Sequence, residues 1–249
     1  MLDVRVGILV QVRMASRRFP RNPMLSLGPR SVIGHVLRRC RGSQKACDVA
    51  VVTSTDATDD VLADFCGFNG VRCFRGPMAQ ILHRHAMALE HLDWDGFARV
   101  LGNSPLIDPR LIDEAIDAYT HREADLVTNI APGNFPCGQE IEVINSRLVR
   151  ERAWRSSPTT EFERATDTDD ARPLPLEVHT IQAPSDWTHT STAIEVPEDL
   201  DTLRALYDRV GGPLLEMDWL SIAQVQAAMA EETGSEITPQ HSDEVRRVA

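Results

Sequence analysis

Short apolar runs rich in β-branched residues alternate with amphipathic segments along this chain, and that alternation restricts the fold more than any other feature. Neighbouring parallel strands need a long crossover between them, usually a helix. The pattern therefore predicts an α/β fold with a mostly parallel sheet flanked by helices. Strands are predicted at residues 4–10, 48–53, 71–75, 97–101, 125–128, 140–144, 176–181 and 192–195. Helices are predicted from residue 32 behind Ser31 as N-cap, and at 58–65, 80–92, 109–119, 147–153, 200–210 and 221–231.

The loops that leave the predicted strands are where function is expected, because ligands of such sheets bind beyond the carboxyl ends of the strands. Four of these loops lie at residues 11–27, 53–60, 102–106 and 195–199. A parallel sheet therefore predicts that residues of these loops, although far apart in the sequence, meet at one edge of the sheet.

The loop after the first strand carries Arg13, Ser16, Arg18 and Arg21 in a proline-containing turn. Guanidinium groups bind phosphate oxygen atoms in pairs, and backbone amides at such an edge can point at the same anion. The alternative is a solvated basic loop in an arginine-rich chain. The loop matches neither G-x-x-x-x-G-K-[ST] nor G-x-G-x-x-G, so ATPase and dehydrogenase functions lose support.

The charge of the chain is unevenly distributed. The 249 residues carry a formal net charge of −11, yet residues 1–45 hold ten Arg or Lys and one Asp, a net of +9, which leaves −20 for the remainder. This distribution suits a small anion held at one place and does not suit a nucleic acid. The sequence shows no apolar run of membrane-spanning length and no secretory signal, so we expect a cytoplasmic protein without membrane contact. The five cysteines form no C-x-x-C pair, which favours reduced thiols over a zinc site.

The sequence QVRMASRRFPRNP at residues 11–23 resembles the signature loop of the cytidylyltransferases that activate sugar acids, such as the 3-deoxy-manno-octulosonate and acylneuraminate cytidylyltransferases. Its pattern is most similar to the spore-coat polysaccharide subgroup, in which the loop reads approximately Q-A-R-M-G-S-T-R-L-P-G-K. Further stretches resemble family motifs in the same order: Phe74-Arg75-Gly76, Leu82 with Arg84, GNSPLIDP at 102–109, Asn129, GQEIEV at 138–143 (similar to G-L-D-V-E-V) and EVPEDL at 195–200 (similar to D-T-P-E-D-L). Together these matches cover about residues 4–210.

The resemblance implies a nucleotide-diphospho-sugar transferase fold, Rossmann-like, with a mostly parallel mixed sheet flanked by helices. It implies a domain over residues 1–212, followed by a C-terminal helical extension and polar tail at 213–249. The implied reaction transfers CMP from CTP to a sugar or sugar acid and releases pyrophosphate, in polysaccharide or specialised sugar biosynthesis. The implied partners are CTP or a related nucleotide, the sugar or sugar acid, and a second copy of the chain in a homodimer.

The resemblance also assigns roles to individual residues. Arg13 and Arg18 are expected as catalytic cations. The expected nucleotide-binding residues are Gln11, Arg13, Ser16, Arg18, Arg21, Asn22, Ser54 and Asn103, and the expected substrate-binding residues are Asn129, Glu140, Glu142 and Arg164. Mg²⁺ is the implied cofactor, with Asn103 and Glu195 at the positions of its ligands.

Several of these positions depart from the family pattern. Asn22 stands where the family has a lysine, and Arg21 where it has the preceding glycine. Asn103 and Glu195 stand where the family has aspartates that bind magnesium. Because Mg²⁺ prefers charged, hard oxygen ligands in near-octahedral geometry, an amide in this position weakens the implied metal site. Two functions are therefore open: an enzyme with a rearranged metal site, or a family member that binds a nucleotide, a sugar or a partner protein without turnover.

Other residues with reactive or metal-binding side chains are not expected in the site. Asp93-Trp94-Asp95 has the D-x-D spacing of glycosyltransferases, but it precedes a predicted strand and so belongs to the wrong edge of the sheet. His83 and His85 are expected in surface or packing roles, because no catalytic partner is identified. Cys137 has no neighbouring base by spacing and is not expected as a nucleophile.

Overall fold

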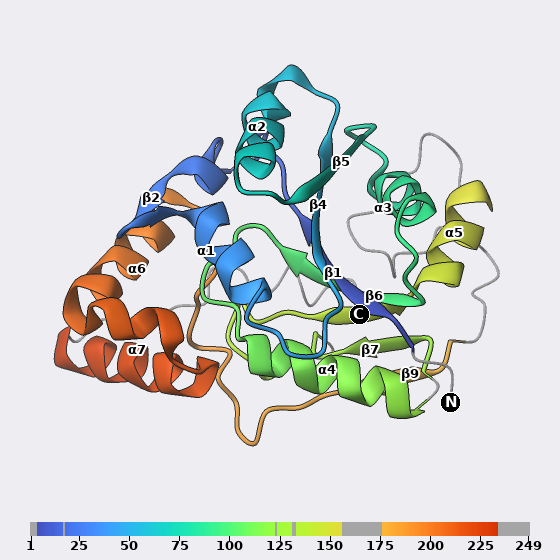
Figure 1. Ribbon diagram of the computed structural model, residues 1–249. Helices are drawn as coiled ribbons and strands as arrows, with labels where there is room; N and C mark the ends of the chain where they lie inside the picture. Colours follow the sequence, from blue (N-terminus) through green and yellow to red (C-terminus); the bar gives the residue numbers. More distant parts are fainter. Residues whose placement is uncertain (1–3, 17, 123, 131–132, 156–175, 234–249) are drawn as a thin grey trace.

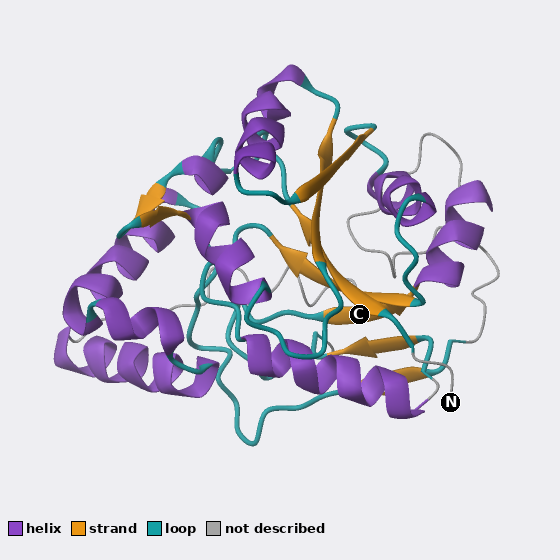
Figure 2. Cartoon of the chain, in the orientation of Figure 1, coloured by secondary structure: helices purple, strands orange, loops and turns teal. Residues whose placement is uncertain are grey.

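A seven-stranded mixed sheet forms the centre of the computed structural model, which describes residues 4–16, 18–122, 124–130, 133–155 and 176–233 (Figures 1 and 2). The strand order is β5-β4-β1-β6-β8-β7-β9, and β2 and β3 form a separate two-stranded ribbon. The strands are β1 (Val6–Gln11), β2 (Ser26–Leu27), β3 (Arg30–Ser31), β4 (Val49–Ser54), β5 (Arg72–Gly76), β6 (Gly96–Leu101), β7 (Leu126–Thr128), β8 (Glu142–Asn145) and β9 (Val178–Thr180). Within the large sheet β8 is antiparallel to β6 and β7, and the other pairs are parallel. The predicted α/β architecture is confirmed.

Helices cover both faces of the sheet because successive side chains of its strands point to opposite sides. Ile8 and Val10 of β1 belong to a buried cluster with α1, α2 and α4, whereas Leu9 between them belongs to a cluster with α3 and α5. The helices are α1 (Val32–Cys40), α2 (Asp60–Phe68), α3 (Ile81–Glu90), α4 (Pro109–Arg122), α5 (Ser146–Arg155), α6 (Pro197–Val210) and α7 (Trp219–Thr233). Short 3-10 turns occur at η1 (Asn22–Met24), η2 (Ala57–Asp59) and η3 (Gly212–Glu216).

Two predicted helix starts are confirmed and one predicted strand is wrong. Ser31 caps α1 by accepting a hydrogen bond from the Gly34 amide at 3.2 Å, and Pro197 is the first residue of α6. Residues 192–195 are not a strand. The preceding residue, Ser191, forms an isolated bridge to Cys137, and residues 192–195 add no strand to the sheet.

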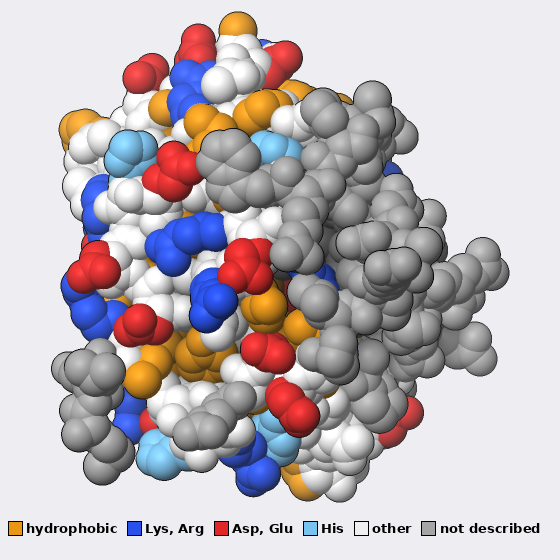
Figure 3. Space-filling view, turned by 90° about the vertical axis from the view of Figure 1, so that its right-hand side faces the viewer, with side chains coloured by type: hydrophobic (Ala, Val, Ile, Leu, Met, Phe, Trp, Pro, Cys, Tyr) orange, Lys and Arg blue, Asp and Glu red, His pale blue; other side chains and the backbone are white. Residues whose placement is uncertain are grey.

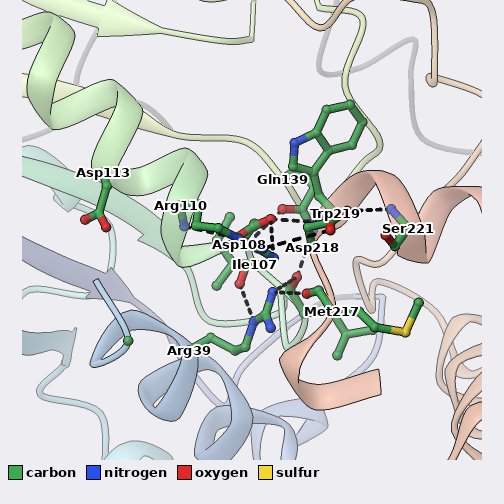
Figure 4. Close-up of polar contacts among 12 residues, drawn as sticks. Arg39, Ile107, Asp108, Arg110, Asp113, Gln139, Met217, Asp218, Trp219 and Ser221 are labelled. Carbon is green, nitrogen blue, oxygen red and sulfur yellow. Dashed lines mark hydrogen bonds and ion pairs between the residues drawn. The ribbon is translucent and has the colours of Figure 1, made fainter. Parts of the chain in front are cut away.

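The C-terminal helices pack onto the loop that follows β6. Figure 4 shows Arg39 of α1, which is buried and donates from Nε to the Ile107 carbonyl at 2.6 Å and from Nη1 to the Leu215 carbonyl at 2.9 Å. The buried Asp108 carboxylate accepts the Trp219 amide at 2.9 Å, at the start of α7. The polar cluster thereby fixes α7 to the loop after β6. The domain boundary predicted after residue 212 stays a prediction.

The surface of the described residues carries both charges. On the face shown in Figure 3, blue and red side chains are interspersed, and no broad field of one sign covers the part that is described. Among the described residues no helix has both the length and the apolar character that crossing a membrane requires.

Candidate functional site

The arginine-bearing loop after β1 is fixed at its base by one buried carboxylate. Asp59, the last residue of η2, is fully buried, and its Oδ1 accepts the Met14 amide at 2.7 Å. Its Oδ2 accepts the Thr53 hydroxyl at 2.8 Å, the Ser54 amide at 2.9 Å and the Ser54 hydroxyl. Asp59 therefore joins the first loop to the carboxyl end of β4. The predicted nucleotide-binding residue Ser54 uses its hydroxyl in this anchor.

The tip of the same loop contacts the segment before α6. Arg18 Nη1 donates to Glu195 Oε2 at 2.6 Å, and the Arg18 side chain is about half exposed. The Asn22 amide Nδ2 donates to the Ile194 carbonyl at 2.9 Å, and Asn22 is buried. The Ile194 amide in turn donates to the Asn103 carbonyl at 2.9 Å. Arg18 and Asn22 of the first loop thus meet Ile194 and Glu195, and Asn103 meets Ile194, although these positions are up to 177 residues apart in the sequence.

Asn22 and Arg21 have structural tasks in this loop. Because the Asn22 amide is committed to Ile194, it does not reach outward as a lysine side chain would. Arg21 adopts a left-handed backbone with φ of 65°, the one such non-glycine residue among those described, and its amide donates to the Met14 carbonyl at 2.9 Å. The residue that reverses the chain here is in the region that glycine occupies most easily.

Two amide oxygen atoms at the carboxyl edge of the sheet have no hydrogen-bond partner in the described structure. They are Gln11 Oε1 at the end of β1 and Asn103 Oδ1, two residues beyond β6, and both are buried. The two strands are neighbours, and the Gly102 amide donates to the Gln11 carbonyl at 2.9 Å. Buried acceptors without partners are rare in folded proteins. These two atoms can accept a donor from a ligand, and Asn103 Oδ1 can also ligate a cation.

A second guanidinium lies in the wall beside the loop. Arg84 of α3 is 2% exposed, its Nη1 donates to the Met78 carbonyl at 3.0 Å, and its Nε has no partner among the described residues. Burial, together with the positive charge of Arg13, lowers the pKa of Arg84 to about 10. Arg13 and Arg84 therefore form a positive region next to the loop. Sequence reasoning noticed Arg84 as a motif match and did not include it in the site.

The predicted substrate-binding residues divide into two groups. Glu140 is partly buried, accepts the Gly138 amide at 2.7 Å and lies close enough to Glu195 for their charges to interact, and desolvation raises the pKa of its carboxyl group. Glu142 instead pairs with Arg99 across the β6–β8 register, with Arg99 Nε to Glu142 Oε2 at 2.6 Å and both side chains buried.

Asn129 is also committed inside the protein. Its Nδ2 donates to the Gln139 carbonyl at 2.7 Å, and its Oδ1 accepts the Ile141 amide at 2.8 Å. In this structure Asn129 and Glu142 support neighbouring backbone and sheet, and Glu140 is the member nearest the Glu195 segment. Arg164 lies outside the described residues.

The residues set aside by sequence reasoning lie where it expected. Asp93 and Asp95 bind Arg5 at the amino-terminal edge of β6, the edge opposite the site. His85 is buried against Phe97 with ring centroids 5.6 Å apart, which is a packing role. Burial raises the pKa of the Cys137 thiol well above its ordinary value, so the thiolate is disfavoured.

Within the described part of the chain, no group of three or more His, Cys, Asp or Glu side chains could hold a metal ion. The chemistry of the donors at Asn103 and Glu195 nevertheless suits a hard cation, because one supplies an unpartnered buried amide oxygen and the other a carboxylate. The amide of Ile194, the residue before Glu195, donates to the Asn103 carbonyl at 2.9 Å, so the backbone of the two segments meets beside these side chains.

A mostly parallel sheet with helices on both faces and an arginine-bearing loop at its carboxyl edge is the architecture of the Rossmann-like nucleotidyltransferases. A sequence model of the cytidylyltransferase family matches residues 7–184, and the chain belongs to that family.

Individual relatives agree with this assignment. The chain is 28% identical over 210 residues to spore coat polysaccharide biosynthesis protein SpsF of Bacillus subtilis (strain 168), covering 82% of this chain and 86% of that protein. It is 31% identical over 134 residues to 3-deoxy-manno-octulosonate cytidylyltransferase of Myxococcus xanthus (strain DK1622), about half of each chain at 53%. Its fold is similar to that of a solved cytidylyltransferase from Leptospira borgpetersenii, with a TM-score of 0.81, 24% identity, and coverage of 95% and 98% of the two chains.

Proposed function

We propose that this chain is a cytidylyltransferase that transfers CMP from CTP to a sugar acid and releases pyrophosphate. The observation that carries the proposal is the contact between Arg18 and Glu195, which brings the cationic loop to the strand ends that present Gln11 and Asn103. Membership of the family and the named activity of the Myxococcus relative support the same reaction. The SpsF relative supports a place in polysaccharide biosynthesis.

The chain's own residues can perform the positioning that this reaction needs. In the transfer a hydroxyl of the sugar acid attacks the α-phosphorus of CTP and gives up its proton to solvent, while the bond to the departing pyrophosphate breaks. Guanidinium groups at Arg13 and Arg18 would neutralise the negative charge that develops on the phosphate oxygens. Asp59 would hold the loop backbone, so that these cations need little reorganisation when the nucleotide arrives.

The ion pair between Arg18 and Glu195 adds a ligand-dependent exchange. In the free protein the two charges neutralise one another at 2.6 Å. A polyphosphate offers Arg18 several oxygen atoms and competes with Glu195 for the guanidinium. Once released, the carboxylate of Glu195 and Oδ1 of Asn103 are the residues that would hold Mg²⁺. When bound there, the metal would supply charge neutralisation and orientation for the polyphosphate.

The direct test is pyrophosphate release from CTP in the presence of Mg²⁺ and a panel of sugar acids, including 3-deoxy-manno-octulosonate and an acylneuraminate. Release that depends on one acid supports the proposal. Arg18→Ala should reduce kcat/KM by about a hundredfold, the scale expected on removing one cation from a preorganised site. If the parent releases no pyrophosphate with any of the sugar acids, in Mg²⁺ or in Mn²⁺, the proposal is contradicted.

A second function, nucleotide binding without turnover, is favoured by two observations. Asn103 provides no charge where the family has aspartate, and Asn22 is buried in a backbone contact where the family has lysine. Asn103→Asp restores the family's carboxylate and is a more informative test than Asn22→Lys, because a lysine at position 22 would place a charge in a buried site. Turnover that appears only with Asn103→Asp would favour this second function, and turnover by the parent would exclude it.

We further infer a homodimer, on the resemblance alone, in a protein that works in the cytoplasm. Light scattering on the purified chain tests the first inference. A mass near 27.7 kDa at micromolar concentration would contradict it.

A further inference from the structure

Three segments that carry site residues meet at the side chain of Gln139, which is fully buried. We propose that Gln139 is a positioning residue that fixes the spacing between Asn103 and Glu195, and through it the affinity of the site for a divalent cation with polyphosphate. The inference rests on the proposed function and assigns to this residue a task in the cation-binding end of the site.

The hydrogen bonds of Gln139 join all three segments. Its Oε1 accepts the Asp108 amide at 2.9 Å, and its Nε2 donates to the Leu106 carbonyl at 2.9 Å, both in the loop after β6 (Figure 4). The same Nε2 donates to Thr192 Oγ1 at 3.2 Å, in the segment that leads to Glu195. Both amide hydrogens and the amide oxygen are therefore used, so the side chain has one fixed orientation.

Each of these segments carries a residue of the site. Asn103 is the second residue of the loop after β6, and the segment of Thr192 reaches Glu195 three residues later. Gln139 itself adjoins Glu140, whose carboxylate lies close enough to Glu195 for their charges to interact. Asn103 and Glu195 stand in separate loops, and a buried side chain that bonds to both loops sets their relative position.

Backbone contacts run alongside this side chain without replacing it. The Thr192 amide donates to the Cys137 carbonyl at 2.7 Å, and the Ile194 amide donates to the Asn103 carbonyl at 2.9 Å. These two bonds join neighbouring segments in pairs. Gln139 bonds to both the loop after β6 and the Thr192 segment from a third one, and so fixes the separation of all three.

Leucine is similar to glutamine in volume and makes no hydrogen bonds. The three directional hydrogen bonds of Gln139 restrict the loops to one arrangement, and leucine at this position would lack all three. Because Asn103 lacks the charge of aspartate, the site depends more on the position of its oxygen atom.

The test uses calorimetric titration of CTP into the full chain without sugar acid, so that no turnover occurs, in EDTA and at stepped Mg²⁺ concentrations. Gln139→Leu should raise the Mg²⁺ concentration for half-maximal strengthening of CTP binding by about tenfold or more, the effect typical of removing a group that orients a metal ligand. The Kd for CTP in EDTA should change by less than about twofold, because the first loop is held independently by Asp59.

Two further variants keep the result interpretable. Gln139→Asn retains the amide on a shorter side chain and should show the same Mg²⁺ shift, since it cannot reach both loops. Asp113→Ala removes the acceptor of the Gln44 and Lys45 amides, in the segment that precedes β4. It should lower the melting temperature and leave both CTP titrations unchanged.

The outcomes separate this inference from the proposed function. Equal weakening of CTP binding with and without Mg²⁺, or no change in Gln139→Leu, would overturn the positioning role while the parent still binds CTP. A parent that shows no affinity for CTP at millimolar concentration under either condition would overturn the proposed function and this inference together. If Gln139→Leu does not fold, Gln139→Asn decides by the same two titrations.

Discussion

At the scale of single residues, the left-handed backbone at Arg21 is the clearest departure from what the local chemistry prefers. Its φ of 65° and ψ of 7° lie in the region that costs a residue with a Cβ about 1 kcal/mol relative to glycine. The family pattern has glycine at this place. Arg21 keeps the conformation because its amide bonds to Met14 and the next residue, Asn22, is anchored to Ile194.

Arg21→Gly should therefore raise the free energy of unfolding by about 0.5 kcal/mol, since relief of the backbone strain exceeds the added entropy of the unfolded chain. Urea denaturation of parent and variant measures the difference. Arg21→Ala serves as control, because it removes the guanidinium and keeps the Cβ, and it should not stabilise. If both variants lose affinity for CTP equally, Arg21 also contacts the nucleotide as the sequence predicts.

At the scale of elements, the site depends on joints, by which we mean buried polar side chains that bond to two segments far apart in the sequence. Asp59 is such a joint, since one buried carboxylate serves the loop after β1 and the end of β4. Asp59→Asn replaces one accepting oxygen with a donor, which leaves either the Met14 amide or the Ser54 amide unsatisfied. We expect a loss of about 1–3 kcal/mol in the free energy of unfolding.

The same substitution should accelerate hydrogen exchange in the loop at residues 14–22 and weaken CTP binding by about tenfold, as the arginines lose their fixed positions. Hydrogen–deuterium exchange followed by mass spectrometry measures the first effect, and calorimetric titration with CTP measures the second. Asp56→Asn is the matched control, because Asp56 caps η2 in the same turn and accepts the exposed Thr58 amide at 2.9 Å. Slow exchange at residues 14–22 in Asp59→Asn would count against the joint.

A second side chain of this kind is Arg39, which connects α1 to the loop after β6 and to the carbonyls of Leu215 and Met217 in the segment before α7. Arg39→Met retains the apolar part of the side chain and leaves several buried carbonyl groups without a donor, including those of Ile107 and Leu215. The free energy of unfolding should fall by about 2–4 kcal/mol, measured by urea denaturation. A loss below about 0.5 kcal/mol would show that water or neighbouring groups satisfy these carbonyls.

The sequence predicts helices and strands far better than it predicts the long-range side-chain contacts that join them. The strand at 49–54 and the helix behind Ser31 follow from local patterns of apolar and capping residues, and both form. Glu142 was assigned to the substrate because its motif matched, yet its partner Arg99 is 43 residues away and becomes visible only through the β6–β8 register. The partners of Asp59 and Gln139 are similarly remote, at separations of up to 45 and 53 residues.

At the scale of the whole molecule, two buried histidines, one on each side of the sheet, predict how stability depends on pH. His85 lies in the layer of α3 and α5, and His35 in α1 is buried on the other side. Burial lowers the pKa of His85 from 6.5 to about 3, and it lowers the pKa of His35 in the same direction. In the folded protein the lowered pKa values favour the neutral form of both imidazole rings.

The sign of the resulting pH dependence follows from proton binding. Between pH 6.5 and 3 the unfolded chain holds a proton on His85 that the folded chain lacks. Acid therefore favours unfolding, and the stability present above pH 6.5 is lost progressively below it. At pH 5, His85 alone should lower the free energy of unfolding by about 2 kcal/mol relative to neutral pH. The raised pKa of Glu140 acts in the opposite direction and reduces the net loss.

Urea denaturation at pH 7.5 and pH 5 measures this loss, and His85→Gln separates the contribution of the ring. The variant cannot titrate at this position, so its stability should fall less between the two pH values than that of the parent, even though it is less stable at pH 7.5. His121→Gln, an exposed change on α4, should keep the parental pH dependence. Equal pH dependence in parent and His85→Gln would contradict this prediction, because His85 would then take up no proton on unfolding.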